Sequence, residues 1–570
     1  MIKNDLEQKI KEIVKRIWKI GEVEINLTNP PTEEQGDFAL GCFELAKSLK
    51  QSPQEIGEKI AKAIETKKID YIKSVQVEGP YVNFKLTNKY FSEQVGQVLQ
   101  KGDNWGRIDL LAGKLFLVEH TDPNLFKEFH IGHLMTNSIG ESLGRIADFA
   151  GAKVRQVTFQ GDVGLHVAKT LYGMMQLKGK MPGTKSDVWE RQSFLGQCYT
   201  FGNKQYEENE DAKKDIVKIN KNVYSREDDE QNKLYEMGKE WSLAYFEEIY
   251  RMVGSKFDHY FLESETFQDG LRLVKENLGT VFQESQGAII FPGSKYGLHD
   301  RVFVNSEGLP TYEAKDLGLF FKKWEKYHPD ISLTITDMEQ KQYFAVVKKA
   351  GGLINREWDE RTIHLAHGTL RLQSGKMSSR TGDIIRAKDW ISEVAEAVDV
   401  KMRSDEKKVA EKVALAAIKY SILKVQAGKN IVYDQEKALS FEGDTGPYLQ
   451  YTYVRALSVL KKAKQKSGDD QKIDEKNDWE IESVKKVPTV GKIILKFPEV
   501  VEQSWQNRSS HHLAGYLHKL AAEFNSFYGQ TKILDEDNED YRYNLYLTEA
   551  VAQTIKNGLY LLGIEVVEEM

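Results

Sequence analysis

Hydrophobic and polar positions along the first hundred residues follow helical and strand-like patterns in turn. Apolar residues recur at helical spacing through the opening segment, at Leu6, Ile10, Ile13, Ile17 and Ile20. Gly21 follows, where a glycine commonly ends a helix. The next segments indicate, in order, a strand, two helices and one or two strands, over residues 22–28, 36–50, 52–66 and 75–87. Residues 1–105 are therefore expected to form a small α+β domain.

The pattern changes at residues 114–120, a short apolar run of the kind that forms a buried parallel strand. Residues 132–151 have the periodicity of an amphipathic helix, and residues 153–159 indicate another strand. These segments predict a βαβ unit, whose first loop lies where doubly wound sheets bind nucleotide phosphates. We expect residues 106–398 to form this Rossmann-like domain, with a helical insertion from about 180 to 300.

Strand signals fade from about residue 400 onward, and long segments with helical periodicity replace them. Residues 399–570 are therefore expected to form an all-α domain. Within it, residues 467–480 are polar and acidic enough to be an exposed linker. The predicted fold class is a multi-domain α/β protein whose doubly wound domain lies between an N-terminal α+β domain and C-terminal helices.

Composition narrows the class of protein. The 570 residues are 40% hydrophobic, which is enough to bury several cores. Charges interrupt every apolar run near the N-terminus, so we expect no signal peptide and no membrane span. With only two cysteines, Cys42 and Cys198, no disulfide framework is expected, and a cytoplasmic location follows as the default. The net charge of -6 means that any nucleic acid would have to bind local basic patches.

The loop of the βαβ unit carries two histidines around a glycine, His130, Gly132 and His133. A histidine pair at a helix start can simply cap or pack the helix, and it can also ligate a metal. A metal, however, needs further ligands at suitable spacing, which the neighbouring sequence does not supply. Phosphate binding uses all three residues, because imidazoles donate hydrogen bonds and glycine allows close approach.

A second motif, LQSGKMSSRTGD at residues 372–383, follows a strand-like segment and is rich in Gly and Ser, as expected of a mobile loop. Lys376 and Arg380 can place cationic groups over a polyphosphate, while Ser378 and Ser379 add hydroxyl donors. Taken alone, a basic loop is more often solvated surface. Its pairing with the histidine motif favours a phosphate clamp.

Together the HIGH sequence at residues 130–133 and KMSSR resemble the two signatures of class I aminoacyl-tRNA synthetases. The longer stretch EHTDPNLFKEFHIGH, residues 119–133, is similar to the form found in the arginyl-tRNA synthetase family. Five more segments are also similar to that family: residues 161–166, 308–318, 441–456, 524–528 and 558–570. The resemblance covers nearly the whole chain.

This resemblance implies that the protein activates L-arginine with ATP and transfers it to the 3′ end of arginine-specific tRNA, releasing AMP and pyrophosphate. ATP would enter as its magnesium complex, with no tightly bound protein cofactor and no protein metal site. The implied catalytic residues are His130, His133 and Lys376. The implied ATP-binding residues are those three together with Gly132, Met377, Ser378 and Ser379.

The resemblance also implies an arginine pocket, formed by Glu119, Asn124, Tyr312, Asp316 and Gln340. Fixed carboxylates suit a planar guanidinium with five donors. A helix beginning at Tyr312 would place Tyr312 and Asp316 on one face. From spacing alone, Glu119 and Asp316 are instead expected to form structural ion pairs. His120, Thr121 and Asp122 stand where the family commonly has small or uncharged residues, so Asp122 is expected to alter the pocket. Ser379 stands where the general class I signature has its second lysine, a place where arginine enzymes often differ and where Arg380 can substitute.

For tRNA, the resemblance assigns the elbow to the N-terminal domain and the anticodon to the C-terminal helices. There the candidate contacts are Tyr448, Tyr451 and Arg455, with Tyr453 nearby, although tyrosines at such spacing are often core residues. The expected protein is a monomer whose partners are tRNA, L-arginine and ATP, without a membrane. Two other functions stay open, a small-molecule adenylyltransferase and a non-catalytic RNA-binding paralogue.

Overall fold

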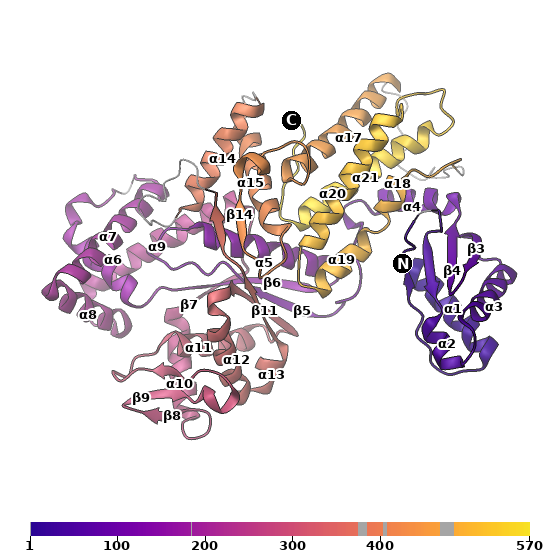
Figure 1. Ribbon diagram of the computed structural model, residues 1–570. Helices are drawn as coiled ribbons and strands as arrows, with labels where there is room; N and C mark the ends of the chain where they lie inside the picture. The colour runs from indigo at the N-terminus through magenta and orange to yellow at the C-terminus, as the bar shows by residue number, and fades with distance from the viewer. Residues whose placement is uncertain (1, 33, 184, 374–384, 403–406, 468–483) are drawn as a thin grey trace. The chain divides into compact units, whose positions relative to one another are not determined.

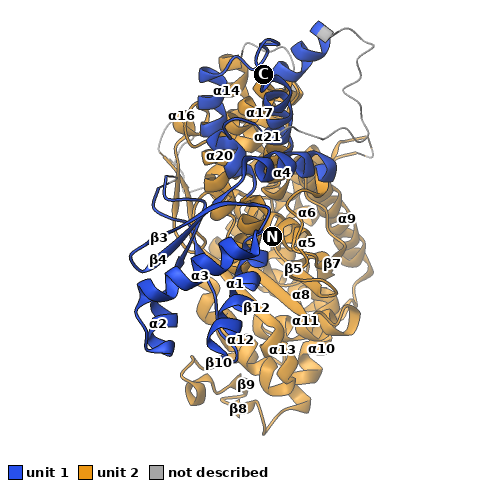
Figure 2. Cartoon of the chain, turned by 90° about the vertical axis from the view of Figure 1, so that its right-hand side faces the viewer, with its two compact units in different colours: residues 1–102, 458–495, 523–553 blue, residues 103–457, 496–522, 554–570 orange. Residues whose placement is uncertain are grey.

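A computed structural model describes residues 2–32, 34–183, 185–373, 385–402, 407–467 and 484–570. The chain divides into two compact units, coloured separately in Figure 2. Unit 1 contains residues 1–102, 458–495 and 523–553, and unit 2 contains residues 103–457, 496–522 and 554–570. Among the described residues, no helix combines the length and the apolar character needed to cross a membrane.

Unit 1 contains a four-stranded antiparallel sheet in the order β1-β2-β4-β3. Its strands are β1 (Leu27–Thr28), β2 (Phe38–Gly41), β3 (Ile72–Glu78) and β4 (Tyr81–Leu86). Its N-terminal helices are α1 (Ile2–Trp18), α2 (Phe43–Leu49), α3 (Pro53–Lys67) and α4 (Asn88–Lys101). The apolar stripe of α1 that the sequence shows packs against α3 and Phe84 of the sheet.

Two sequence-based expectations for this unit are wrong in detail. The helix expected over residues 36–50 is divided, because Phe38–Gly41 form β2, which pairs with β4, and only Phe43–Leu49 are helical. Pairing with a neighbouring strand overrides the local helical pattern here. The strand expected over residues 22–28 is confined to its last two residues, Leu27 and Thr28.

Unit 2 is built around a five-stranded sheet in which every neighbouring pair is parallel, in the order β12-β11-β5-β6-β7. The strands are β5 (Leu115–Glu119), β6 (Lys153–Gln160), β7 (His259–Leu262), β11 (Ile331–Asp337) and β12 (Thr362–His367). The chain enters at the central strand β5, winds outward through β6 and β7, and returns to the other side through β11 and β12. This is a doubly wound order, whose switch point lies at the carboxyl end of β5.

Helices cover both faces of this sheet. Figure 1 shows α5 (Ile131–Phe149) on one side and α10 (Glu263–Glu276), α11 (Tyr312–Lys326), α12 (Lys341–Ile354) and α13 (Arg356–Arg361) on the other. Successive residues of β5 face opposite ways, so Leu117 packs with Leu319 of α11 while Val118 lies against Gly144 of α5. The predicted βαβ unit of β5, α5 and β6 is confirmed.

The segment between β6 and β11 differs from the expected single helical insertion of residues 180–300. Between β6 and β7 it forms α6 (Leu165–Gln176), α7 (Val188–Glu208), α8 (Glu210–Ser225) and α9 (Asp229–Met252). It then returns to the sheet as β7, which pairs with β6, before a small antiparallel sheet forms from β8 (Gln283–Ser285), β9 (Ala288–Phe291) and β10 (Arg301–Val304). The expectation failed because β7 is only four residues long and stands between long helices.

The C-terminal part of the chain is almost entirely helical. Its helices are α14 (Ala387–Met402), α15 (Lys407–Leu423), α16 (Gln435–Ala438), α17 (Gly446–Ser467), α18 (Thr489–Ile494), α19 (Phe497–Gln506), α20 (His511–Gln530) and α21 (Tyr541–Leu561). One short strand, β14 (Ile431–Tyr433), interrupts the expected all-α region and pairs in parallel with β13 (Leu370–Leu372). Strands β13 and β14 thus form a two-stranded sheet that is separate from the main sheet.

Candidate active site

The two histidines of the HIGH sequence form the first turn of α5, directly beyond the carboxyl end of β5. His130 is the N-cap residue, and its Nδ1 accepts a hydrogen bond from the Gly132 N–H at 3.1 Å. His133 Nδ1 accepts a hydrogen bond from the His130 N–H at 3.2 Å. The imidazole rings stack with centroids 3.6 Å apart. The capping role considered for this pair is therefore real, and it occupies one nitrogen of each ring.

The capping bonds fix the protonation of both rings. An Nδ1 atom that accepts a hydrogen bond carries no proton, so a neutral imidazole must hold its proton on Nε2. Burial, with Lys127 nearby, lowers the pKa of His130 to about 4. Burial, His130 and Lys127 lower the pKa of His133 well below its ordinary value. At neutral pH the two rings thus each keep an Nε2–H donor that the cap does not use, and phosphate oxygens suit such donors.

Gly132 is required by the packing between these histidines. A Cβ atom at this position would lie 3.0 Å from the imidazole of His130, which is closer than most real contacts. Any larger residue would push the ring away from the cap. The predicted need for glycine in this motif therefore has a local steric cause as well as the expected one of close ligand approach.

Carboxylates from three elements gather at the same end of the sheet. Glu119 ends β5 and is only 3% exposed, and its carboxylate forms an ion pair with Lys323 of α11. Glu263 begins α10 and is also buried, with its carboxylate 2.8 Å from Lys315 Nζ. The ion pair considered as an alternative for Glu119 is thus present. It holds Glu119 rigidly at the sheet edge.

Asp316 differs from those two carboxylates because its hydrogen-bond donor is neutral. The Tyr343 hydroxyl donates to the Asp316 carboxylate. Burial raises the pKa of Asp316 to about 7, the Tyr343 hydrogen bond opposes this, and the charges of Glu119 and Glu263 add to it. No lysine, arginine or histidine nitrogen in the described part of the chain lies within 4.0 Å of the Asp316 carboxylate. Asp316 is therefore a half-buried acceptor that a cationic ligand can complete.

Tyr312 is the first residue of α11, so a helix does begin there and places Tyr312 one turn before Asp316. Its side chain is 61% exposed, and Lys315 Nζ lies 4.9 Å from the ring centroid. Asn124 reaches the same region from the loop after β5, since its amide oxygen and the Glu263 carboxyl group both lie against Gly161. These contacts bring Tyr312 and Asn124 to the Glu263–Lys315 pair.

Gln340 is less closely integrated than the other predicted pocket residues. It ends the short 3-10 helix Met338–Gln340 beyond β11, and its side chain is exposed. The contacts that the structure describes do not join it to Glu119, Asn124, Tyr312 or Asp316. It follows the carboxyl end of β11, the strand that pairs with β5.

Four charged or titratable residues of this region were missed from the sequence: Glu263, Lys315, Lys323 and His166. The sequence could have pointed to Lys315 and Lys323, because both lie in the same helix as Asp316, at positions that are buried. Glu263 had none beyond its place after a very short strand. His166 lies in the GDVGLH segment, and its Nε2 is 3.2 Å from the Gly161 carbonyl oxygen. Burial and the cations Lys127 and Lys315 lower the pKa of His166 to about 3.

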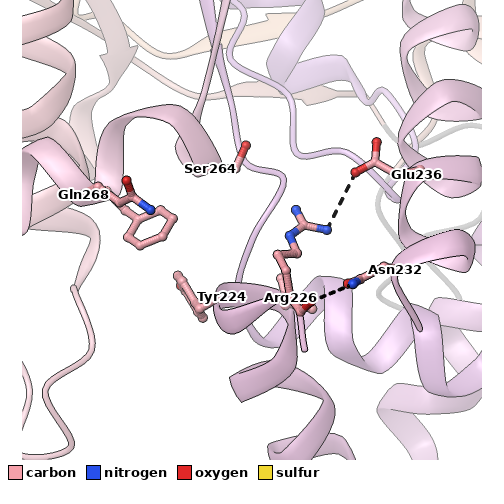
Figure 3. Close-up of a pocket in the computed structure, with 8 residues that line it drawn as sticks. Tyr224, Arg226, Asn232, Glu236, Ser264 and Gln268 are labelled. Atoms are coloured by element: carbon pink, nitrogen blue, oxygen red, sulfur yellow. Dashed lines mark hydrogen bonds and ion pairs between the residues drawn. The ribbon is translucent and has the colours of Figure 1, made fainter. Parts of the chain in front are cut away.

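A cavity of about 430 Å³ adjoins the Glu263–Lys315 pair. Figure 3 shows Tyr224 and Gln268 on one side of it and Arg226, Asn232 and Glu236 on the other. The Asn232 side chain donates to the Arg226 carbonyl oxygen at 2.8 Å, and the Arg226 guanidinium lies 3.8 Å from the Glu236 carboxylate. The Tyr224 hydroxyl also hydrogen-bonds with Lys315. The wall of the cavity and the carboxylate cluster are therefore linked.

Lys376, Met377, Ser378 and Ser379, like Arg380, lie outside the described residues. The chain that follows them does lie beside the HIGH sequence. The Ile131 N–H donates to the Ile385 carbonyl oxygen at 3.1 Å, and the Ala387 N–H donates to the Phe129 carbonyl oxygen at 3.0 Å. Arg386 adds an ion pair with Glu128 at 3.1 Å.

The candidate tRNA residues Tyr448, Tyr451 and Arg455 lie on α17 and are all half-buried. Arg455 Nη2 donates to the Tyr451 hydroxyl at 2.9 Å, and its guanidinium lies 4.7 Å from the Tyr451 ring centroid. The Tyr448 ring packs 6.0 Å from the His518 ring. Each aromatic ring is therefore partly committed to packing within the helices.

Side-chain donors hold the C-terminal end of α21 against α5 and its neighbours. Arg145 of α5 donates to the Tyr560 carbonyl oxygen at 2.9 Å, and the buried Ser142 donates to the Leu561 carbonyl oxygen at 2.8 Å. Lys419 of α15, only 2% exposed, donates to the carbonyl oxygens of Val253 at 2.6 Å and Gly563 at 2.5 Å. We call this set of bonds the α21 clamp. It ties the helix that bears His130 and His133 to the last helix of the chain.

Comparisons with known proteins agree along the whole chain. Three family models match: the arginyl tRNA synthetase N terminal domain over residues 2–86, the class I (R) tRNA synthetase catalytic domain over 94–435, and the DALR anticodon binding domain over 449–570. An arginine–tRNA ligase of Borreliella burgdorferi is 30% identical in an alignment that covers 96% of this chain and 94% of that relative. One of Clostridium acetobutylicum is 30% identical in an alignment that covers 98% of this chain and 99% of that relative.

The solved structure of Thermus thermophilus arginyl-tRNA synthetase matches with a TM-score of 0.80 and 25% identity, covering 100% of both chains. The predicted fold class is confirmed, with a parallel catalytic sheet between an N-terminal domain and C-terminal helices. The domain boundaries expected from the sequence stay a prediction. With its catalytic-domain match covering more than half of its length, the chain belongs to the arginyl-tRNA synthetase family.

Proposed function

We propose that this protein joins L-arginine to arginine-specific tRNA at the expense of ATP. In the first step an oxygen of the arginine carboxylate bonds to the α-phosphorus of ATP and pyrophosphate leaves, which gives arginyl-adenylate. In the second step a ribose hydroxyl of the tRNA 3′ end attacks the acyl carbon and AMP leaves. The observation that carries the proposal is the placement, at one end of the sheet, of a half-buried Asp316 with no cationic partner within 4.0 Å in the described chain and of two neutral histidine donors.

For the activation step, His130 and His133 donate from Nε2 to phosphate oxygens, and Lys376 balances the charge that grows as the bond to pyrophosphate lengthens. No protein nucleophile is needed, because the substrate carboxylate attacks the phosphorus directly. Catalysis then rests on positioning and on electrostatic stabilisation. Gly132, Met377, Ser378 and Ser379 are proposed to complete the ATP site. Magnesium is proposed to arrive on the ATP phosphates, as is usual for that ion.

For arginine recognition, the proposed pocket uses Glu119, Asn124, Tyr312, Asp316 and Gln340. The guanidinium is placed against Asp316, whose carboxylate has no cationic partner within ion-pair distance in the described chain. A guanidinium presents five donors in one plane from three nitrogens, whereas a lysine ammonium presents three donors from a single nitrogen and cannot match a planar, forked set of acceptors. A pocket of fixed polar groups therefore discriminates strongly between the two amino acids.

For tRNA, the proposed contacts are the N-terminal domain and the C-terminal helices, with Tyr448, Tyr451 and Arg455 on α17. The chain is proposed to act as a monomer in the cytoplasm. Docking of the RNA is proposed to favour the competent conformation of the catalytic loops, so that amino-acid activation depends on tRNA. Since phosphate contacts carry much of RNA affinity, this dependence should weaken as salt is raised.

The test is aminoacylation of total tRNA with each of the twenty amino acids. Arginine alone should be attached, and lysine should be rejected. Replacing Asp316 by alanine should weaken arginine binding at least about tenfold, because the guanidinium loses its partner in a desolvated site. Charging with another amino acid, or unchanged arginine affinity in the variant, would contradict the proposal.

A second measurement separates this function from that of a small-molecule adenylyltransferase. Arginine-dependent exchange of labelled pyrophosphate into ATP is followed with and without arginine-specific tRNA. The proposed coupling predicts exchange only when tRNA is present. A full rate without RNA would remove the coupling and leave the arginine assignment intact.

A further inference from the structure

The carboxyl groups around the proposed arginine pocket outnumber the cations that pair with them. The carboxyl-bearing residues are Glu119, Asp122, Glu263 and Asp316. Their fields overlap, because Glu119 acts on both aspartates and Glu263 acts on Asp316. Lys323 pairs with Glu119 and Lys315 pairs with Glu263. In the described chain neither aspartate has an ion-pair partner within 4.0 Å, so two carboxyl groups remain to be matched.

Asp122 and the residue before it have unfavourable backbone conformations, whose energetic cost other interactions must offset. Asp122 has a φ of +42°, and the β-branched Thr121 before it has a φ of +81°. Both values lie in the left-handed region, which is costly for residues other than glycine and unusual for threonine. This conformation turns Asp122 back over the end of β6. There its Oδ1 accepts a hydrogen bond from the Phe159 N–H at 2.7 Å.

Only one of the two oxygens of Asp122 has a described partner. Oδ1 takes the Phe159 N–H and a weaker bond from the Thr158 hydroxyl at 3.3 Å. No hydrogen bond to Oδ2 occurs among the described residues. Burial and the charge of Glu119 raise the pKa of Asp122 well above its ordinary value. The carboxyl group therefore resists ionisation until a cation lies beside it.

The substrate of the proposed function carries two cationic groups, a guanidinium and an α-ammonium. The two groups lie at opposite ends of the molecule, so they need two separate partners. Asp316 lies within α11, beside Tyr343 and in the field of Glu263. Asp122 lies in the loop that runs from β5 directly to His130. The α-ammonium is one carbon from the carboxylate that must reach the ATP phosphate, which places it on the His130 side.

From this charge count and this placement, we propose that Asp122 binds the α-ammonium group of L-arginine and so helps to determine substrate specificity. The inference rests on the proposed function, because it assumes arginine as the substrate. Oδ1 stays on the β6 backbone and orients the carboxylate, while Oδ2 accepts from the ammonium. The strained turn at Thr121 and Asp122 is then the geometry that presents this oxygen to the ligand.

The test compares two ligands on three proteins by calorimetry in the absence of ATP. The ligands are L-arginine and 5-guanidinopentanoate, which keeps the guanidinium and the carboxylate but lacks the α-ammonium. The proteins are the wild type, Asp122→Asn and Asp316→Asn. Asparagine has nearly the same shape as aspartate and keeps an oxygen for the Phe159 N–H, so the loop is expected to stay in place.

Asp122→Asn should lower the affinity for L-arginine about tenfold or more, because the ammonium group loses its charged partner. The affinity for 5-guanidinopentanoate, which has no ammonium group, should stay within about twofold of the wild-type value. Asp316→Asn should lower the affinity for both ligands by a similar factor. Equal losses for both ligands in Asp122→Asn, or no loss for either, would overturn the assignment of Asp122. Wild-type protein that binds no arginine at all would instead overturn the proposed function.

Discussion

Arginine binding should depend on pH through the titration of Asp316. Burial raises the pKa of this carboxyl group to about 7, so the neutral form is favoured in the empty pocket up to neutral pH. A neutral carboxyl group attracts a guanidinium far less than a carboxylate does. The sign of the effect is therefore fixed: arginine affinity rises as the pH rises through 7 and falls as it drops below.

The size of the effect follows from that pKa. A group with a pKa of about 7 is roughly one-tenth ionised at pH 6 and roughly nine-tenths ionised at pH 8. If only the ionised form binds, the affinity for arginine rises about tenfold between these values, or roughly 1.4 kcal/mol. An aspartate at its ordinary pKa would be fully ionised throughout and would give no change.

The assay is calorimetric titration of arginine at pH 6, 7 and 8, repeated in two buffers with different ionisation enthalpies. Below pH 7, binding should release a proton from Asp316, so the observed heat should differ between the buffers. Asp316→Asn should show a smaller rise in affinity. Glu325→Gln, which changes an exposed carboxyl group on the same helix, should keep the wild-type profile. Parallel profiles for the wild type and Asp316→Asn would refute the reasoning.

Three further changes test other parts of the site. Lys376→Ala should slow pyrophosphate exchange about a hundredfold and lower the affinity for ATP much less, because a contact to the transition state is lost. Equal losses in the exchange rate and in the ATP affinity would instead make Lys376 an ordinary substrate-binding residue. His130→Asn should keep the thermal stability, since asparagine caps helices well, but lose activation, whereas His130→Ala should also lose about 1 kcal/mol of stability. An active His130→Asn would contradict the donor role. Lys419→Met should lower the free energy of unfolding in urea by about 1 to 3 kcal/mol, because the Gly563 and Val253 carbonyl oxygens lose a buried donor; an unchanged value would show that the α21 clamp is dispensable.

The sequence predicted most of the sheet that positions the site. The strand at 114–120 and the helix at 132–151 have strong, uninterrupted patterns, and both form close to the expected bounds. The short strands β2 and β7 were missed because their stability comes from pairing with distant strands, which no local pattern records. Helix α11 was placed correctly at Tyr312 because its first turn carries a family motif.

The site itself was only partly accessible to sequence reasoning. The family resemblance singled out His130 and Asp316 as candidates, but it did not reveal that the histidine Nδ1 atoms accept the hydrogen bonds that cap the helix. It also did not reveal the lysines that neutralise Glu119 and Glu263, since ion pairing joins residues about two hundred and about fifty positions apart. Charge balance in a pocket is a property of the folded chain, and no local sequence pattern records it.

The α21 clamp has a consequence for the order in which the protein matures on the ribosome. Helix α5 is synthesised more than four hundred residues before Tyr560, whose carbonyl oxygen accepts a hydrogen bond from Arg145. Until that segment has emerged, Arg145 can bind only Glu141 and the Gly254 carbonyl oxygen, and the buried Ser142 lacks the Leu561 carbonyl oxygen. A nascent or prematurely terminated chain therefore carries His130 and His133 on a helix whose supporting contacts are incomplete. Full activity is therefore expected only after the last helix has been synthesised.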